Sequence, residues 1–298
     1  MDDVLVSISC LTYNHEQFIE QCIDGFLTQR TNFAFEILIH DDASPDSTQN
    51  ILKEYENKYP DKFRIIYRSE NIHSQGYRSL NRFNYERARG KYIAICEGDD
   101  FWIDSNKLQK QVDFLEQNPD YSMCFHDAIK LDETNNIINR FCPYRRDCDL
   151  TIHDAIHNWY VPTASIVVRK EIILNYKSSI PQIYSEDYSI ILKCIHAGRV
   201  RYINRLMSVY RLNSSETSMS SAMKNKNIFM LEQKILLLNS FKSITNNLYT
   251  TEINSRLKYL NQELKFQKAK KSKNLIHLLL SYKLIFTKLA LKIIRIRQ

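Results

Sequence analysis

Apolar and polar residues alternate along the first hundred positions in a pattern that predicts short buried strands separated by amphipathic helices. Apolar runs bounded by polar turns predict strands over residues 4–10, 35–40, 63–67 and 91–96. Between the strands, apolar residues recur at helical spacing, as at Phe18, Ile19, Cys22, Ile23, Phe26 and Leu27. Strands that alternate with helices are typical of a parallel sheet covered on both faces, so the expected fold class is α/β.

Two local signals predict where helices begin and end in this region. Asn14, with Gln17 three residues later, predicts a capping box at the start of the first helix. Gly90 is expected as the glycine that ends a helix running through Phe83 and Tyr85.

The pattern after residue 104 is less regular. It predicts helices that begin near residues 108, 186 and 225, and strands over 121–129, 164–168 and 199–211. We expect one domain over residues 1–215, with halves of about 1–104 and 105–215, followed by a helical extension over 216–298.

Polar clusters follow three of the predicted strands. They are Thr12-Tyr13-Asn14, Asp41-Asp42 and Glu97-Gly98-Asp99-Asp100. Ligands of parallel α/β sheets bind beyond the carboxyl ends of the strands, so these clusters are expected to converge in one crevice. Adjacent carboxylates repel each other, and a hard divalent cation that also binds phosphates relieves the repulsion. The sequence therefore predicts a metal–diphosphate site; the alternative for Glu97–Asp100 is an acidic surface turn.

The net charge of +7 is concentrated at one end of the chain. Residues 265–298 contain ten Lys and Arg and no Asp or Glu, so the rest of the chain carries 7 − 10 = −3. A nucleic-acid-binding body is expected to be basic itself, so this distribution argues against nucleic acid as a partner.

The cysteines and the first residues indicate a cytoplasmic protein. There are seven cysteines without a Cys-x-x-Cys pair, which favours reduced thiols over a zinc cluster or a disulfide framework. The first residues, Met1–Val4, lack the features of a signal peptide, and nothing before residue 274 resembles a membrane span.

Five motifs together resemble the family-two inverting glycosyltransferases of the GT-A type. In the order and at the separations of that family, they are Ser7–Asn14, Glu36–Thr48, Gly90–Ile93, Glu97–Asp100 and Ser185–Asp187. The resemblance covers roughly residues 4–215. It implies a Rossmann-like, mostly parallel central sheet with a nucleotide-sugar half and an acceptor half.

The resemblance also implies how a UDP-sugar donor binds. Asp42 should bind the uracil edge with Asp41 nearby, and Tyr13 should lie against the base, between Thr12 and Asn14. A carboxylate accepts the imide N–H of uracil, and an aromatic ring offers a stacking face.

The same resemblance implies that a second set of residues binds the diphosphate and the metal. Asp99 and Asp100 match the metal-binding pair, and at least Asp100 should contact Mn²⁺ or Mg²⁺. Glu97 stands where many relatives have Asp, and Asn213 replaces a family histidine. Candidates for diphosphate contact are Arg78, Arg82 and Asn84.

Asp187 matches the catalytic base of the family. An inverting transfer is one in-line displacement, in which a carboxylate takes the proton of the attacking hydroxyl. The alternative for Asp187 is an ordinary acidic residue at a helix N-terminus. Trp102, His126 and Glu186 are candidates for the acceptor site, with plain packing as the alternative for Trp102 and His126.

The basic tail over residues 265–298 has an amphipathic pattern that suits the surface of an anionic membrane. Its alternative is a helix packed on the catalytic domain or on a second subunit of a homodimer. The membrane interpretation places the protein peripherally on the inner face of a bacterial plasma membrane. By association with relatives, the acceptor is then a glycan or a polyprenyl-linked chain of a surface polysaccharide.

Two other functions compete with the transferase. A nucleotidyltransferase also uses a nucleotide-binding α/β sheet with paired acids, but its glycine-rich phosphate loop has no counterpart in Leu11–His15. A non-catalytic membrane-bound scaffold would not require the acidic pairs and Asp187 to be intact.

Overall fold

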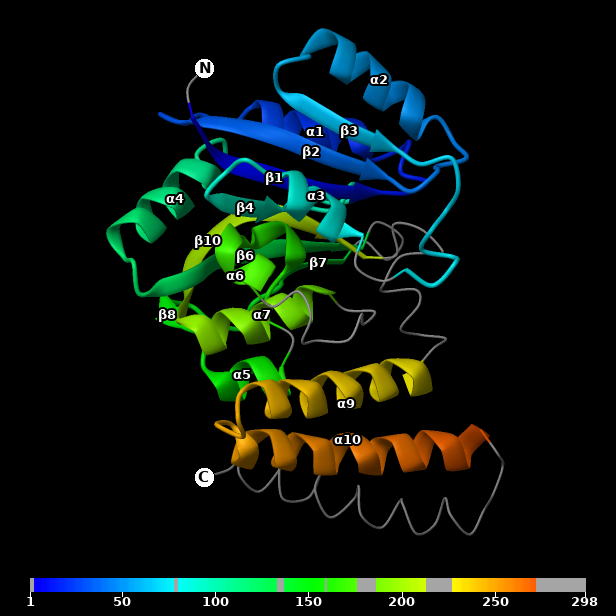
Figure 1. Ribbon diagram of the computed structural model, residues 1–298, viewed down its shortest axis with the longest axis vertical. Coiled ribbons are helices and arrows are strands. Elements are labelled where there is room, and N and C mark those ends of the chain that lie inside the picture. The colour runs from blue at the N-terminus through cyan, green and yellow to red at the C-terminus, as the bar shows by residue number, and fades with distance from the viewer. Residues whose placement is uncertain are drawn as a thin grey trace. The chain divides into compact units, whose positions relative to one another are not determined.

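The computed structural model describes residues 3–77, 80–132, 137–158, 160–175, 186–212 and 227–271 (Figure 1). The chain divides into two compact units, Met1–Ser218 and Met219–Gln298. Arg78, Ser185, Asn213 and the tail beyond residue 271 lie outside the described residues, so the expectations placed on them are not addressed by the structure.

The first unit is built on a ten-stranded mixed sheet. Its main strand order is β3-β2-β1-β4-β9-β6-β10-β5, while β7 pairs with β6 and β8 pairs with β10. The strands are β1 (Val4–Thr12), β2 (Ala34–Asp41), β3 (Phe63–Tyr67), β4 (Tyr92–Ile95), β5 (Phe101–Trp102), β6 (Tyr121–Asp132), β7 (Ile137–Arg140), β8 (Cys148–Asp149), β9 (Val167–Arg169) and β10 (Arg199–Arg211).

The strand directions bring six carboxyl ends to one edge of the sheet. Strands β1, β2, β3 and β4 are mutually parallel, and β6 is parallel to β10. Strand β9 runs antiparallel to both β4 and β6, so β6 and β10 have the same direction as β4. The chain therefore leaves β1, β2, β3, β4, β6 and β10 at the same edge, where an α/β sheet binds its ligands.

Helices cover both faces of this sheet. Helices α1 (Ile19–Leu27), α2 (Thr48–Lys58) and α4 (Lys107–Gln117) supply side chains to one continuous apolar core. Helices α3 (Asn81–Arg87), α6 (Lys170–Asn175) and α7 (Glu186–Ala197) lie in front of the sheet in Figure 1 and pack next to one another. The short helices α5 (Ile152–His157) and η1 (Thr163–Ser165) complete the first unit as described.

The two faces of β1 differ in chemistry because successive side chains point in opposite directions. Val6, Ile8 and Cys10 join the apolar core, whereas Ser7 and Ser9 are buried on the side of α3. Ser7 Oγ donates to Glu36 Oε1 at 2.7 Å. The sheet therefore has one apolar face and one face with a buried polar layer.

Glu36 is the charged centre of this polar layer. The Arg89 backbone N–H donates to Glu36 Oε1 and the Arg89 side chain to Oε2, each at 2.8 Å. Burial alone would raise the pKa of Glu36, but these bonds and the Ser7 hydroxyl hold that pKa below its ordinary value. The paired charge fixes the segment after α3 against β1 and β2.

Gly90 has a different function from the predicted one. Helix α3 ends at Arg87, and the next residue, Ala88, is already extended. A Cβ atom on Gly90 would lie 2.6 Å from Ser7 N and 2.7 Å from Val6 C. Gly90 is therefore required because the chain crosses β1 at close range, and not as a left-handed helix cap.

Two further predictions about local structure are wrong. Asn14 does not cap α1, which begins at Ile19 without a side-chain cap; Asn14 instead has a left-handed φ of 59°. The strand predicted over 164–168 is shorter, because η1 occupies its first part and β9 begins at Val167. Both errors lie where contacts distant in sequence decide the backbone.

The second unit contains α9 (Asn227–Ile244) and α10 (Thr250–Lys271), which pack against each other. The helical pattern predicted over 225–266 is thus interrupted by a turn, in which Asn246 and Asn247 have positive φ. The ring of Phe241 stacks on that of Tyr249 across this turn at 5.7 Å. No helix among the described residues is long and apolar enough to span a membrane.

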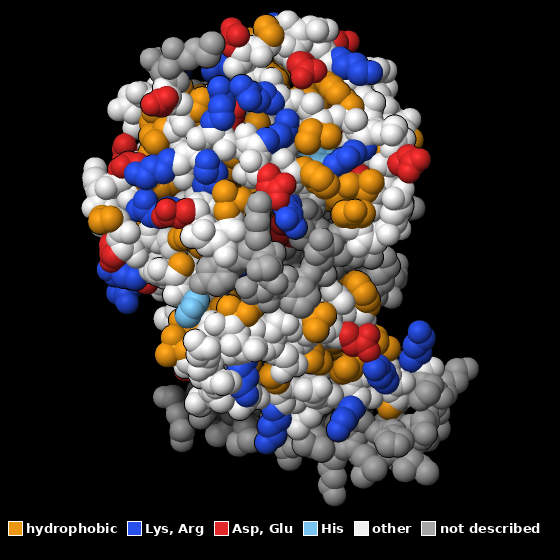
Figure 2. Space-filling model, in the orientation of Figure 1, with side chains coloured by type: hydrophobic (Ala, Val, Ile, Leu, Met, Phe, Trp, Pro, Cys, Tyr) orange, Lys and Arg blue, Asp and Glu red, His pale blue; other side chains and the backbone are white. Residues whose placement is uncertain are grey.

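The described surface carries both signs of charge. Figure 2 shows Lys and Arg side chains interspersed with Asp and Glu on the face in view. Several of these charges form exposed ion pairs, such as Lys91 with Glu116 at 2.7 Å and Arg82 with Glu86 at 2.8 Å. Exposed pairs of this kind contribute at most about 1 kcal/mol each.

Gly90→Ala is expected to lower the free energy of unfolding by about 2 kcal/mol, because the added methyl group overlaps the backbone of β1. Urea denaturation measures the change, with Glu54→Ala at an exposed position of α2 as a near-neutral control. Equal stability of the two variants would contradict the close crossing.

Candidate active site

Three loops are joined at the carboxyl edge of β1, β2 and β4. The Asp42 N–H donates to Thr12 O at 3.1 Å, and the Gly98 N–H donates to Leu11 O at 2.8 Å. A Cβ atom on Gly98 would lie 2.8 Å from Thr12 Oγ1, so the acidic loop after β4 rests directly on the end of β1. The predicted clusters at Thr12, Asp42 and Glu97–Asp100 therefore lie side by side.

The loop after β1 is held from the neighbouring loop after β2. The Asn14 N–H donates to Ser44 Oγ at 2.9 Å, and the His15 N–H donates to Thr48 Oγ1 at 3.0 Å. Tyr13, directly before Asn14, is half-buried, whereas Asn14 is exposed. These bonds explain why Asn14 takes a left-handed conformation instead of starting a helix.

Asp41 and Asp42 have different partners although they are adjacent. The buried Asp41 carboxylate accepts from the N–H and hydroxyl of Ser44, and from Gln49 Nε2 at 2.5 Å. Asp41 thus organises its own loop.

The Asp42 carboxylate reaches across to a third loop. It accepts the backbone N–H groups of Ile72, at 2.9 Å, and His73, at 3.0 Å. Each carboxylate oxygen has a second lone pair, so Asp42 keeps the capacity to accept from a ligand.

The acidic loop after β4 is fixed by Arg211 at the end of β10. The Arg211 N–H donates to Asp100 Oδ1 at 2.9 Å, and its guanidinium donates to Asp99 O at 2.6 Å and to Gln21. The guanidinium also lies over the ring of Phe101 at 4.5 Å. Sequence reasoning did not include Arg211 in the site, although it stands in the segment noted for Asn213.

Asp100 has one oxygen that nothing satisfies. Its Oδ2 is buried and has no hydrogen-bond partner in the part of the chain that the structure describes. Burial, with Asp99 nearby as a second cause, raises the pKa of Asp100 well above its ordinary value. An orphaned carboxylate oxygen beside a second carboxylate suits a hard divalent cation.

The protein supplies only part of a metal coordination shell in this region. Among the described residues, no three His, Cys, Asp or Glu side chains form a group that could hold a metal ion. Mg²⁺-type sites commonly use one or two carboxylates with substrate phosphates and water, so Asp99 and Asp100 fit such an ion together with a diphosphate.

A second carboxylate pair comes from the first turn of α7. The half-buried Asp187 carboxylate accepts from Thr163 Oγ1 at 3.3 Å and from the Tyr188 N–H at 2.8 Å. Glu186 is hydrogen-bonded to Asn81 of α3, and burial raises the pKa of Glu186 to about 7.

The carboxylates of the acidic loop after β4 interact with those at the start of α7. Burial raises the pKa of Glu97 to about 8, and the negative charges of Asp99, Asp187 and Glu186 add to the rise. Like charges in a buried place, where the dielectric constant is low, disfavour ionisation of one another. The structure therefore brings Glu97 and Asp99 together with Glu186 and Asp187, which stand almost ninety positions later in the chain.

Tyr210 borders the same cluster and was missed by sequence reasoning. It is half-buried on β10, and burial together with the charges of Asp100 and Glu97 raises its pKa well above the ordinary value. Its ring meets that of Phe141 edge-on at 5.2 Å. No sequence signal distinguishes Tyr210 from the other tyrosines of the chain.

Trp102 does not have the exposure expected of an acceptor platform. It is 4% exposed, its Nε1 donates to Ala164 O at 2.8 Å, and its ring packs on Phe26. The Lys107 ammonium lies over the ring at 4.0 Å. We correct the expectation: Trp102 is part of the core, because β5 carries it under α1.

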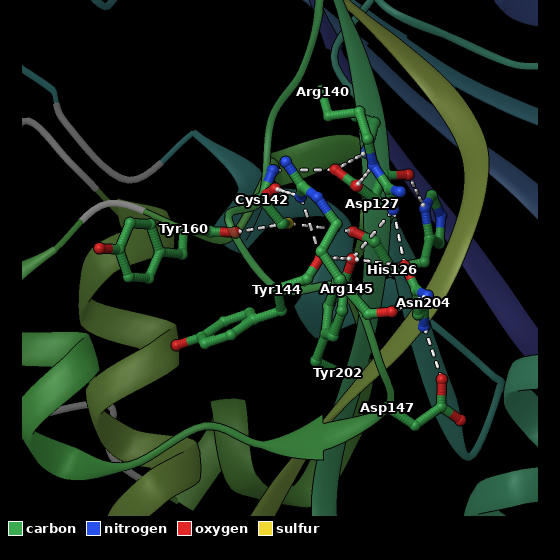
Figure 3. Close-up of polar contacts among 11 residues, drawn as sticks. His126, Asp127, Arg140, Cys142, Tyr144, Arg145, Asp147, Tyr160, Tyr202 and Asn204 are labelled. Atoms are coloured by element: carbon green, nitrogen blue, oxygen red, sulfur yellow. Dashed lines mark hydrogen bonds and ion pairs between the residues drawn. The ribbon is translucent and has the colours of Figure 1, made fainter.

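His126 is corrected in the same way. It is fully buried on β6, its Nδ1 lies 2.8 Å from Asp127 O, and burial lowers its pKa well below the ordinary value. Figure 3 shows the polar network around it, in which the Asp127 carboxylate accepts from the Cys142 N–H and from Arg140 Nε. This network joins β6 to β7 and to the loop that follows, so it has a structural role.

The diphosphate candidates near α3 also separate. Asn84 is fully buried, and its Nδ2 donates to Ser9 Oγ and to the carbonyl oxygens of Cys10 and Leu38. Asn84 therefore anchors α3 to the sheet and is not available to a ligand. Arg82 is exposed and pairs with Glu86, while Arg78 lies outside the described residues.

Comparisons with known proteins show the family of the chain. Residues 7–173 match the family described as Glycosyl transferase family 2. An uncharacterized protein of Mycobacterium tuberculosis is 34% identical over 206 residues, which are 69% of this chain but only 58% of that protein. The chain thus matches somewhat more than half the length of its mycobacterial relative.

Two further similarities extend the comparison. The Escherichia coli protein named UDP-Glc:alpha-D-GlcNAc-diphosphoundecaprenol beta-1,3-glucosyltransferase WfgD is 27% identical over 220 residues, 73% of this chain and 81% of that protein. The crystal structure of S. aureus TarS 1-349 in complex with UDP superposes with a TM-score of 0.63 at 16% identity, covering 89% of this chain and 72% of that chain. The likeness to TarS supports the fold.

Asp100→Asn is expected to raise the free energy of unfolding by about 1 kcal/mol at pH 7 in the presence of a chelator. The amide keeps an oxygen for the Arg211 N–H and removes a buried charge. Because the folded pKa of Asp100 is raised, its charge destabilises the fold only above the unfolded pKa of about 3.9, so the gain should vanish below about pH 4.

The matched control is Asp104→Asn. The pKa of Asp104 is lowered, since Lys110 at 2.5 Å and the Asn106 N–H outweigh its burial. This variant should lose stability at pH 7. Urea denaturation of both variants measures the contrast, and a loss in Asp100→Asn would contradict the orphaned oxygen.

Proposed function

Because the chain belongs to glycosyl transferase family 2, we propose that it moves a sugar from a UDP-sugar to a hydroxyl of a glycan or lipid-linked acceptor, with inversion, in bacterial surface polysaccharide synthesis. The observation that carries the proposal is the meeting of Glu97 and Asp99 with Glu186 and Asp187 beside the orphaned oxygen of Asp100. Asp99 with Asp100 would serve the leaving diphosphate, and Asp187 would serve the incoming hydroxyl.

The nucleotide would bind at the ends of β1 and β2. Asp42 is held by two backbone N–H groups and keeps free lone pairs for the imide N–H of uracil. Tyr13 next to it offers a ring for the base, with Thr12, Asn14 and Asp41 shaping the loop. WfgD is named for a UDP-Glc donor, and the TarS structure is described as a complex with UDP; both support a uridine donor here.

A divalent cation, Mn²⁺ or Mg²⁺, would be held by Asp100 and Asp99. When bound, it supplies Lewis-acid stabilisation of the departing UDP diphosphate. Arg211 keeps the two carboxylates in place, because it holds both the Asp99 carbonyl and Asp100 Oδ1.

Asp187 would act as the general base. The Thr163 hydroxyl and the Tyr188 N–H orient its carboxylate at the start of α7. An acceptor hydroxyl attacks the anomeric carbon from the face opposite UDP, and its proton passes to a carboxylate oxygen of Asp187. Glu186 in the same turn remains the proposed acceptor-side contact.

The acceptor and the location are proposals of the same kind. WfgD is named for an acceptor linked to diphosphoundecaprenol, which supports a polyprenyl-linked glycan as the acceptor of this chain. We propose that the basic tail over residues 265–298 binds an anionic membrane surface on the cytoplasmic side. Its described part is the last turn of α10, where Lys268 pairs with Glu232, and Lys270 and Lys271 follow.

UDP is expected to raise Tm only in the presence of Mn²⁺ or Mg²⁺, because Asp99 and Asp100 would hold the cation that offsets the charge of the diphosphate. A ligand at about 100 times its Kd stabilises by about 2.7 kcal/mol, which amounts to several degrees in Tm. Thermal shift assays with UDP, with GDP as the control nucleotide, measure the effect. Equal stabilisation by UDP after chelation would remove the metal from the proposal.

Asp187→Asn is expected to bind UDP-sugar as the wild type does and to lose sugar transfer by about 10²–10⁴-fold, since the amide cannot take a proton. Asp113→Asn makes the same change on the exposed face of α4 and should leave transfer unchanged. Single-turnover transfer assays with titrations of UDP-sugar separate binding from chemistry. Full activity of Asp187→Asn would reject it as the base.

A further inference from the structure

Tyr85 on α3 has a buried hydroxyl group without a partner. The residue is 2% exposed, and its hydroxyl oxygen makes no hydrogen bond to any described residue. The described residues include four other tyrosines that are at most 5% exposed, and each gives its hydroxyl an acceptor: Tyr92 to Glu116, Tyr121 to Asp149, Tyr188 to Ile156 O and Tyr202 to Tyr144 O. Buried hydroxyl groups are normally paired, so Tyr85 requires an explanation.

The position of Tyr85 in the fold directs its side chain to the carboxylate cluster. Asn81 lies one helical turn earlier, and residues four apart share one face of a helix. Asn81 is hydrogen-bonded to Glu186. Its Oδ1 also accepts from Ser9 Oγ, on the second half of β1, at 2.8 Å. Tyr85 therefore stands on the face of α3 that meets both the carboxyl edge of the sheet and the start of α7.

The electrostatics agree with this placement. Burial raises the pKa of Tyr85 well above its ordinary value, and the charges of Glu186, Asp187 and Glu97 raise it further. The phenol keeps its proton at neutral pH and is thus a hydrogen-bond donor. The carboxylates that it faces are acceptors when ionised.

A sugar hydroxyl matches this arrangement because it donates one hydrogen bond and accepts others. It can donate to a carboxyl oxygen, such as that of Glu97, and accept from the phenol at the same time. The transferred sugar must also lie between the diphosphate side, at Asp99, and the base side, at Asp187. We propose that the Tyr85 hydroxyl donates a hydrogen bond to the sugar of the donor and helps to select it; this inference rests on the proposed function.

The test compares Tyr85→Phe with Tyr92→Phe in the full-length chain. Tyr92 is equally buried, but its hydroxyl bonds to Glu116, and it starts β4 at the end of that strand away from the carboxyl edge. Titration calorimetry with Mn²⁺ gives the Kd values of UDP, UDP-Glc and UDP-GlcNAc for each protein. The readout is the ratio of the Kd of each UDP-sugar to the Kd of UDP.

Tyr85→Phe is expected to weaken binding of the preferred UDP-sugar about tenfold and to leave the Kd of UDP unchanged, because UDP has no sugar to contact. Tyr92→Phe should leave both Kd values unchanged. The unfolding stability of Tyr85→Phe should equal or exceed that of the wild type, since the lost hydroxyl has no partner. Tyr92→Phe should be less stable than the wild type.

Unchanged UDP-sugar affinity in Tyr85→Phe would overturn the inference, and so would equal losses for UDP and UDP-sugar. A wild type that binds neither UDP nor a UDP-sugar would overturn the proposed function first and this inference with it. The two failures are therefore distinguishable from the wild-type titrations alone.

Discussion

Repulsion between carboxylates at one edge of a sheet is the constraint on which the rest of this structure depends. Glu97 and Asp99 leave β4 there, and Glu186 and Asp187 begin α7 opposite them. Such a concentration of like charge is costly in a partly buried place unless protons or cations balance it. The Arg211 guanidinium supplies one positive group, at the Asp99 carbonyl, and the Arg211 backbone N–H donates to Asp100 Oδ1. The remaining imbalance is what makes the edge a binding site for a cation and a polyhydroxylated ligand.

The fold holds these charges in place through a buried polar layer on the α3 face of the sheet. Glu36 with Arg89, and Ser9 with Asn81 and Asn84, fix α3 and the start of β4 against β1. Each of these groups has its partners, so the layer is rigid as well as polar. A loosely held scaffold would let the carboxylates move apart. The apolar core on the other face stabilises the fold, whereas the polar layer on the α3 face positions the carboxylates.

The pattern of the sequence was enough to predict the α/β sheet, most of its strands and the convergence of Asp42, Glu97 and Asp100, because period and strand direction follow from local composition. It was not enough for Trp102 and His126, whose burial depends on β5 and β6 packing against helices elsewhere in the chain. Asn14 and Gly90 were misjudged for the same reason. The backbone of Asn14 is fixed by its hydrogen bond to Ser44, and that of Gly90 by its close approach to β1. Rules for helix caps consider only residues nearby in sequence and therefore miss such neighbours.

Asp100 Oδ2 and the Tyr85 hydroxyl oxygen are buried near the edge without a partner among the described residues. Both destabilise the fold, since a buried polar group without a partner loses its bonds to water and gains none. They have different chemistry: one belongs to a carboxyl group, which is an acceptor when ionised, and the other is a neutral donor. A single ligand that contains both a cation-bridged diphosphate and a sugar ring would satisfy the two together. The two groups that lower the stability of the fold are thus the groups that a bound nucleotide sugar would satisfy. The same unpaired groups that destabilise the site would therefore give it specificity for this ligand.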